Sequence, residues 1–161
     1  PGAASSEAAM CGGSGTPAYE LGGRDARSAT LCLLNRERDG RGPKALHIDS
    51  EQQKAAGDHN RMMIRKRCFS HQCSGERDLV ERMEDSGYLP CSCSWSVGEN
   101  IAWGTGSTAS PRKIVDAWMN SPPHRMNILS KSFDEVGLAI DGSPAGGGKT
   151  ATFTADFGIK N

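Results

Sequence analysis

The chain has 161 residues, a length that suits one domain with a single hydrophobic core. Lys and Arg total 19 and Asp and Glu total 19, so the formal net charge is zero and no global field favours nucleic acid or an anionic membrane as a partner. No apolar run approaches the ~20 residues that span a bilayer, and the first residues carry no Met, basic region or apolar stretch, so we expect no transmembrane segment and a trimmed N-terminus.

The N-terminal part of the chain has the composition of a linker. Residues 1 to about 22 are rich in Gly, Ala and Ser and show little periodicity, which predicts a flexible segment over residues 1–22 and a domain over residues 23–161. Leu31 and Leu34 then predict a first helix, which Gly and Pro signals in residues 39–43 end.

Two further helices are expected before the sheet begins. Asp49 can cap a second helix that runs to about Arg67 and carries His59 on its inner face. The apolar residues that define its buried side recur at helical spacing: Ala55, Ala56, Met62 and Met63. The two methionines are expected to fill gaps in the core. A third helix should cover residues 76–86, where Gly87 stops it.

Residues 95–103 alternate in a way that is typical of a strand. One face of this strand would carry Glu99 among apolar side chains, namely Trp95, Val97, Ile101 and Trp103. A carboxylate in such a row needs a partner or a raised pKa. The three tryptophans, Trp95, Trp103 and Trp118, are expected to serve mainly in packing, although one exposed edge could stack on a sugar or line a lipid groove.

The last third of the chain predicts two helices and a hairpin. Ser110 can cap a helix that ends near Ser121, and a Ser-Pro-Pro break then starts a short helix carrying His124. The positive end of that helix dipole favours a neutral imidazole, the form that binds metal or accepts a proton. Alternation over residues 136–140 and 151–157 predicts an antiparallel hairpin. Helices followed by strands with intervening helices indicate the α+β class.

Several ordered motifs between Ala29 and Gly158 resemble a bacterial member of the CAP superfamily, which comprises cysteine-rich secretory proteins, antigen 5 and pathogenesis-related proteins. The motifs are Leu33-Leu-Asn-Arg-Glu-Arg38, Asp58-His-Asn-Arg-Met62, Phe69-Ser-His71, Gly98-Glu-Asn-Ile101, Trp118 to Leu129, and Thr154-Ala-Asp-Phe-Gly158. The resemblance implies a three-layer α-β-α sandwich with a central antiparallel sheet.

The resemblance also implies a cleft that holds two histidines and two acids. The histidines correspond to His71 and His124, and one acid corresponds to Glu99. The second acid departs from the pattern, because neither Asn120 nor Ser121 at its position is a carboxylate.

Two imidazoles and one carboxylate can hold Zn²⁺ or another divalent metal with one position left for water. His71 and His124 would be ligands. Glu99 would be either a third ligand or the hydrogen-bond acceptor for the other ring nitrogen of one of these histidines. In the alternative, purely structural interpretation, Glu99 accepts hydrogen bonds from a histidine or from backbone N–H groups and locks the cleft wall. Asn100 and Ser121 complete the residues expected to line the cleft.

A hydrolase would use the same residues in other roles. Glu99 could act as general base on a metal-bound water, or Ser121, His124 and Glu99 could form a nucleophile, base and orienting acid. Neither arrangement has a sequence motif of its own here, since His-Glu-x-x-His and Gly-x-Ser-x-Gly are both absent. We therefore expect binding rather than catalysis, with a peptidase as the alternative.

The resemblance implies a small ligand, such as a lipid, a sterol or a peptide, and an extracellular or cell-envelope location, and we expect a monomer. A third possibility is an interaction module at the cell envelope that uses the basic run Arg61, Arg65, Lys66 and Arg67. Basic residues near a helix C-terminus also complement its dipole, which is the ordinary explanation of such a run.

Six cysteines in a small domain indicate disulfides and an oxidising compartment. We expect Cys11 to join Cys32, closing a ~20-residue loop worth about 3 kcal/mol in the chain-entropy model. Cys91 and Cys93 are too close to pair without strain, so cross-links from Cys68 and Cys73 to these two are the preferred arrangement among fifteen possible pairings.

Overall fold

One four-stranded sheet runs through the middle of the molecule, in the strand order β1-β3-β4-β2. A computed structural model describes residues 11–89, 94–142 and 148–161. The strands are β1 (His47–Ile48), β2 (Trp95–Thr105), β3 (Glu135–Asp141) and β4 (Thr150–Lys160). Antiparallel pairing joins β2 to β4 and β3 to β4, as predicted for the hairpin, whereas the short β1 pairs in parallel with β3.

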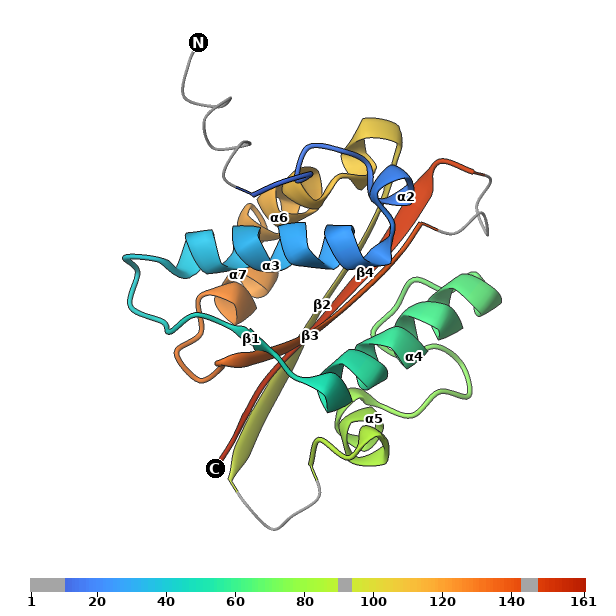
Figure 1. Cartoon of the computed structure of the whole chain (residues 1–161). Helices are drawn as coiled ribbons and strands as arrows, with labels where there is room; N and C mark the ends of the chain where they lie inside the picture. The colour runs from blue at the N-terminus through green and yellow to red at the C-terminus, as the bar shows by residue number, and fades with distance from the viewer. Residues whose placement is uncertain (1–10, 90–93, 143–147) are drawn as a thin grey trace.

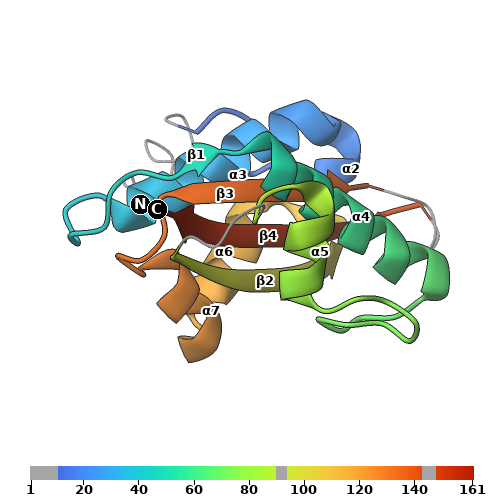
Figure 2. The same cartoon turned by 90° about the horizontal axis from the view of Figure 1, so that it is seen from below.

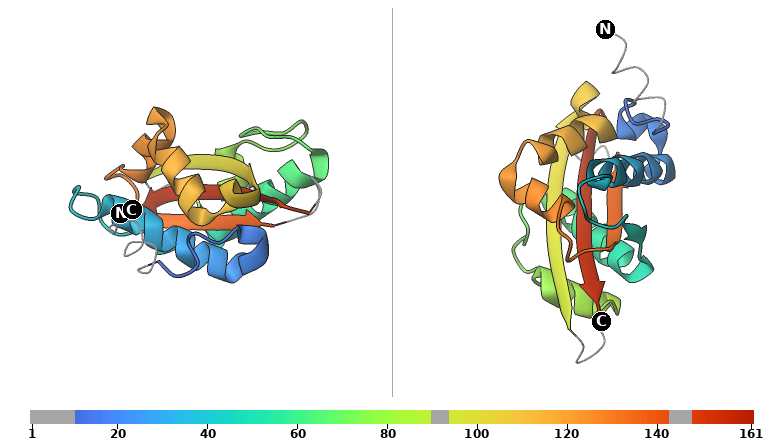
Figure 3. Two further views of the ribbon diagram at one scale, coloured as in Figure 1. Left: turned by 90° about the horizontal axis from the view of Figure 1, so that it is seen from above. Right: turned by 90° about the vertical axis from the view of Figure 1, so that its left-hand side faces the viewer.

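Helices cover both faces of this sheet (Figure 1). The helices are α2 (Ala18–Leu21), α3 (Gly23–Arg38), α4 (Ser50–Lys66), α5 (Leu79–Ser86), α6 (Pro111–Met119) and α7 (Pro122–Ile128), with a 3₁₀ turn η1 (Gly106–Ala109). Figure 2 looks onto the side of α4 and α5, and the left view of Figure 3 looks onto the opposite side, where α3 and α6 lie. The predicted three-layer α-β-α sandwich is confirmed.

The larger apolar core lies between the sheet and the layer of α3, α6 and α7. Alternate residues of the two central strands point into it, namely Val136, Leu138, Ile140, Phe153, Ala155 and Phe157. Trp118 of α6 is 2% exposed and donates from Nε1 to the backbone oxygen of Ile101, 3.1 Å away. The prediction that Trp118 packs in the core is therefore confirmed.

On the other face of the sheet, α4 lies unusually close to the strands because two glycines leave room for it. A Cβ atom added to Gly137 would lie 2.2 Å from the backbone carbon of Gln52, and one added to Gly158 would lie 2.4 Å from its side-chain nitrogen. A larger residue at Gly137 would require the helix backbone to move, and one at Gly158 would require the side chains of Gln52 and Tyr88 to move. This close approach brings His59, also on α4, against the sheet.

The predicted helix boundaries agree with the caps that the structure shows. Asp49 caps α4 by accepting from the backbone N–H of Gln52, and Ser110 caps α6 by accepting from that of Lys113. The third helix begins at Leu79, three residues after the predicted start at position 76. The cause is a capping box in which Asp78 is the N-cap.

The N-terminal segment differs from its prediction. Cys11 and Ala18 are 1% and 2% exposed and belong to the main core, and the backbone N–H of Arg112 donates to the oxygen of Ser14 at 2.8 Å. Part of the segment predicted as a flexible linker over residues 1–22 is thus packed, while residues 1–10 lie outside the described chain. The Cys11–Cys32 disulfide that ties it down is confirmed.

Two other predictions are wrong. Cys68 pairs with Cys73, so neither can join Cys91 or Cys93, both of which lie outside the described residues. Sequence spacing had not revealed that the chain between these two cysteines turns back on itself within five residues.

The second error concerns the tryptophans of β2. Trp95 and Trp103 are 42% and 55% exposed rather than packed. Both tryptophans lie towards the ends of β2, outside its buried middle, which holds Glu99 and Ile101.

Candidate functional site

Glu99 faces the layer of α4 and α5. Its neighbours Val97 and Ile101 pack against the small apolar clusters on that side of the sheet, so the alternation of β2 turns Glu99 the same way. Glu99 is 7% exposed as a residue. A carboxylate buried at this depth needs charged or hydrogen-bonding partners.

Asp156 of β4 is the direct cross-strand partner of Glu99. The backbone N–H of Asn161 donates to the oxygen of Ser94 where the two strands meet at one end. Because hydrogen-bonded and non-hydrogen-bonded pairs alternate, the even-numbered residues of β2 bond to β4, and Glu99 and Asp156 form a non-hydrogen-bonded pair. The two carboxyl groups are therefore held on one face at the register where side chains approach most closely.

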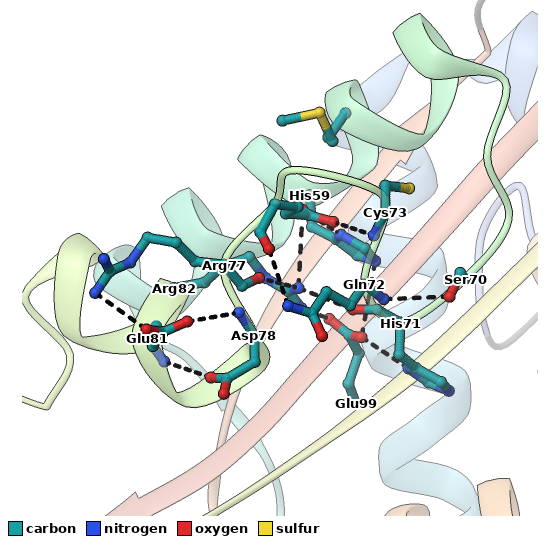
Figure 4. A network of polar contacts seen from close by, with 12 residues as sticks. His59, Ser70, His71, Gln72, Cys73, Arg77, Asp78, Glu81, Arg82 and Glu99 are labelled. Atoms are coloured by element: carbon teal, nitrogen blue, oxygen red, sulfur yellow. Dashed lines mark hydrogen bonds and ion pairs between the residues drawn. The ribbon is translucent and has the colours of Figure 1, made fainter.

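Three basic side chains surround Glu99 (Figure 4). His71 Nδ1 lies 2.8 Å from Oε1, Arg82 Nη2 donates to Oε2, and His59 Nε2 lies 3.7 Å from Oε1. Burial by itself would raise the pKa of the Glu99 carboxyl, but the hydrogen bonds from His71 and Asp156 and the charge of Arg82 outweigh it and lower this pKa. Glu99 is thus an ionised carboxylate with both oxygens already bonded.

Asp156 lies next to Glu99, and no described basic side chain donates a hydrogen bond to its carboxyl group. It is 0% exposed, and neither of its carboxyl oxygens meets a donor among the described side chains and backbone groups. Burial, followed by the negative charge of Glu99, raises the pKa of Asp156 well above its ordinary value. The neutral acid can donate its proton to Glu99, which removes the repulsion between two adjacent carboxylates.

His71 is the part of this network that reaches the surface. Its side chain is 60% exposed, while the Nδ1 atom is held by Glu99. The hydrogen bond that His71 donates to Glu99 raises the pKa of the imidazole, against the opposing effect of partial burial. The Cys68–Cys73 disulfide closes the loop that carries His71, and Figure 4 shows the far edge of the ring pointing away from the network.

His124 comes from the opposite layer, on α7. Its Nδ1 atom lies 2.8 Å from Ser121 Oγ, and its backbone oxygen accepts from Asn100 Nδ2 at 3.0 Å. Asn127 Nδ2 in turn donates to Asn100 Oδ1 at 2.9 Å. Partial burial, followed by the positive charge of His71, lowers the pKa of His124. The neutral form predicted for His124 agrees with this direction, although burial is the leading cause rather than the helix dipole.

The two histidines therefore approach the outer strand β2 from opposite layers of the sandwich. Alternation along β2 explains this, because Glu99 faces α4 and α5 while the next residue, Asn100, faces α7. We call His71, Glu99 and His124 the histidine site. Within the described part of the chain, the two oxygens of Glu99 serve His71 and Arg82 rather than His124.

This arrangement limits what a metal could find here. Within residues 11–89, 94–142 and 148–161, no group of three or more His, Cys, Asp or Glu side chains is arranged to hold a metal ion. Glu99 could become a ligand only by giving up His71 or Arg82, and Ser121 stands where a second acid would help. The described residues do not form a three-ligand metal site.

The model of the cysteine-rich secretory protein family, CAP, matches residues 31–157. The chain belongs to the CAP family.

Relatives of this CAP domain come from several bacteria. The protein YkwD of Bacillus subtilis (strain 168), itself uncharacterised, is 36% identical over 106 residues, which are 66% of this chain and 38% of that protein. The chain therefore spans less than half of the curated relative it matches.

Solved structures support the same fold. An outer surface protein of Borrelia burgdorferi has a TM-score of 0.72 at 18% identity and covers 86% of this chain and 95% of that one. An extracellular protein with an SCP domain from Bacillus anthracis has a TM-score of 0.65 at 20% identity and covers 83% of this chain and 42% of that one. In the CAP domain described here, no helix of the described segments is long and apolar enough to cross a membrane.

Sequence reasoning missed the inner half of the site, which consists of Arg82, Glu76 and Asp156. A signal for Arg82 was present, because it falls within the stripe of Leu79 and Met83 on one face of α5 and thus predicts a buried cation next to an unpaired acid. Glu76 lies in the loop before α5, and its Oε1 atom is 2.6 Å from His59 Nδ1. Nothing in the local sequence of Glu76 indicated this contact.

The basic run of α4 lies apart from this network. Arg61, Arg65, Lys66 and Arg67 are all exposed. Arg61 pairs with Asp58 and Lys66 donates to a backbone oxygen, as on an ordinary solvated helix face.

Proposed function

We propose that this CAP domain is a non-catalytic binding domain that acts outside the cytoplasm, and that His71 and His124 contact a small ligand at the edge of β2. The observation that carries this proposal is the tethering of His71. One ring nitrogen is fixed by a buried, ionised carboxylate, while most of the side chain remains exposed. A ring held in one orientation loses little entropy on contact with a ligand, which favours recognition.

The location rests on two observations. The disulfides Cys11–Cys32 and Cys68–Cys73 are typical of an oxidising compartment. Structural neighbours are described as an outer surface protein and an extracellular protein. Recovery of the protein from the medium or envelope fraction with both disulfides intact would support the location, whereas a reduced cytoplasmic protein would refute it.

A divalent metal such as Zn²⁺ is the first ligand to test. His71 and His124 would hold it, and Glu99 would remain the acceptor of the His71 Nδ1 proton, which is a common way of orienting a metal-binding imidazole. A bound zinc would act as a Lewis acid for a carboxylate or carbonyl of a second ligand. With two protein ligands instead of the three or four usual in zinc proteins, we expect weak binding. A lipid, a sterol or a peptide is the alternative ligand class.

The experiment compares the wild type with His71→Ala/His124→Ala. Zinc titration by calorimetry and mass spectrometry of small molecules that co-purify with the native protein are both measured. His47→Ala is the matched control, because His47 is an exposed histidine on β1 outside the site. Loss of zinc or of a co-purified ligand in the double variant alone would support the proposal. Retention of every ligand by the double variant would refute it.

A serine peptidase is the second candidate, because Ser121 Oγ lies 2.8 Å from His124 Nδ1. The orienting acid of such a triad would have to be Glu99, yet its oxygens are bonded to His71 and Arg82. We therefore expect no peptidase activity on unfolded or peptide substrates. Activity that disappears in Ser121→Ala would overturn this expectation and favour the catalytic function.

A further inference from the structure

Arg82 connects the two parts of the site that lie on the α4 and α5 side of the sheet. Its Nη2 atom donates to Glu99 Oε2, and its Nη1 atom donates to the backbone oxygen of His71 at 2.9 Å. One planar guanidinium therefore contacts both the carboxylate that orients the imidazole and the main chain that carries it. Figure 4 shows Arg82 reaching from α5 towards these two groups.

Arg82 is itself firmly held. The residue is 7% exposed, and its neighbour Met83, at 0%, anchors α5 in the apolar cluster beneath it. Nη1 also donates to the backbone oxygen of Arg77 at 3.3 Å and lies 3.7 Å from Glu76 Oε1. Because these contacts leave the guanidinium few alternatives, the position of α5 is transmitted to the loop of His71.

We propose that Arg82 is the positioning residue of the histidine site, which sets the orientation of the His71 ring by holding Glu99 and the His71 backbone at once. This inference deepens the proposed function, since it assigns the origin of the site's geometry. It concerns the ligand-free protein and can therefore fail independently of whether any ligand binds.

The competing explanation is that Arg82 only neutralises the buried charge of Glu99. The two explanations differ in what they require of the side chain. Neutralisation requires one positive charge, whereas positioning requires two donors in a fixed geometry. Lys keeps the charge but presents a compact ammonium in place of the planar guanidinium, so Arg82→Lys separates charge from geometry.

The test is the NMR spectrum of the His71 ring in ligand-free wild type and Arg82→Lys, at one neutral pH. In the wild type we expect a single ring orientation with a slowly exchanging Nδ1 proton bonded to Glu99. In Arg82→Lys we expect loss of that protected proton and averaging of the His71 ring signals, with the His124 signals unchanged. His71 signals identical to the wild type would overturn the proposal and leave Arg82 as a counter-charge only.

A second measurement covers the case in which Arg82→Lys does not fold. In the wild-type protein the Nη protons of Arg82 should exchange slowly with solvent and show contacts to the backbone of His71. Arg24→Lys is the control for the substitution itself, because Arg24 is an exposed arginine of α3. Fast exchange of the Arg82 Nη protons, equal to that of Arg24, would overturn the proposal without any variant of Arg82.

Discussion

Arg38 of α3 holds the chain that follows α7, and its replacement should destabilise the domain strongly. Arg38 is 1% exposed. Its guanidinium donates to four backbone oxygens, those of Lys44, Ile128, Ser130 and Phe133. Three of these oxygens follow one another between the end of α7 and β3, so Arg38 replaces the missing partners of a helix C-terminus. In Arg38→Met the carbon stem remains and all four hydrogen bonds are lost.

The magnitude follows from the burial of the oxygens. The bonds to Ile128 and Phe133 are fully buried, whereas those to Lys44 and Ser130 are part-buried and can be replaced by water. A buried oxygen left without a donor costs about 1–3 kcal/mol, so the two buried oxygens predict a loss of about 2–6 kcal/mol. A loss of this size is a large share of the stability of an ordinary domain.

The assay is equilibrium unfolding in urea, with Arg24→Met as the control for removing an arginine from an exposed position of the same helix. We expect the control to change stability by less than about 0.5 kcal/mol. Because α7 carries His124, a folded Arg38→Met protein should also show altered His124 ring signals. An Arg38→Met protein as stable as the control would refute this account of how α7 is held.

Two further substitutions test the surroundings of Glu99 and of the His71 loop. Burial and the charge of Glu99 raise the pKa of Asp156 above the ordinary value of 3.8, so its contribution to stability is fully present below that value and decreases as pH rises towards the raised pKa. In Asp156→Asn the amide donates at every pH, so the variant should gain stability relative to the wild type as pH rises above 3.8, and parallel pH profiles of urea unfolding would contradict this. In Cys68→Ala/Cys73→Ala, loss of a cross-link between residues five apart should cost about 2 kcal/mol in the chain-entropy model and broaden the His71 ring signals. Sharp, unshifted His71 signals in that variant would show that Glu99 and Arg82 fix the loop without the disulfide.

The layers of the fold were predictable because each element depends on local chemistry. Asp49 and Ser110 are caps whose side chains bond the first turn of their own helices. The alternation of side chains over residues 136–140 and 151–157 predicted strands that the structure shows as β3 and β4. The exposure of Trp103 was not predictable in this way. It depends on which part of β2 other elements cover, and this is a property of the packed domain that no local pattern contains.

The outer half of the site was predictable from motifs, and the inner half was not. Asp156, like Glu99, His71 and His124, stands in a segment that resembles a known family, but its place beside Glu99 depends on the register of β2 against β4. A register is set by the whole pattern of pairing, and a shift by one residue would turn Asp156 to the other face. Its burial beside another acid therefore becomes visible only once the strands are paired.

The outer position of β2 gives the histidine site its distinctive property. A central strand would have both faces and both edges covered, so side chains from the two helical layers could not meet at the surface beside it. At an outer strand the two layers come together past the edge, and in the function proposed above His71 from one layer and His124 from the other contact the same ligand. The two sides differ in support, since Glu99 and Arg82 hold His71 by charge, whereas Asn100 and Asn127 hold α7 by neutral hydrogen bonds. Charge-assisted hydrogen bonds are stronger than neutral ones. We therefore expect His71 to keep its position when a ligand binds, and His124 with α7 to shift.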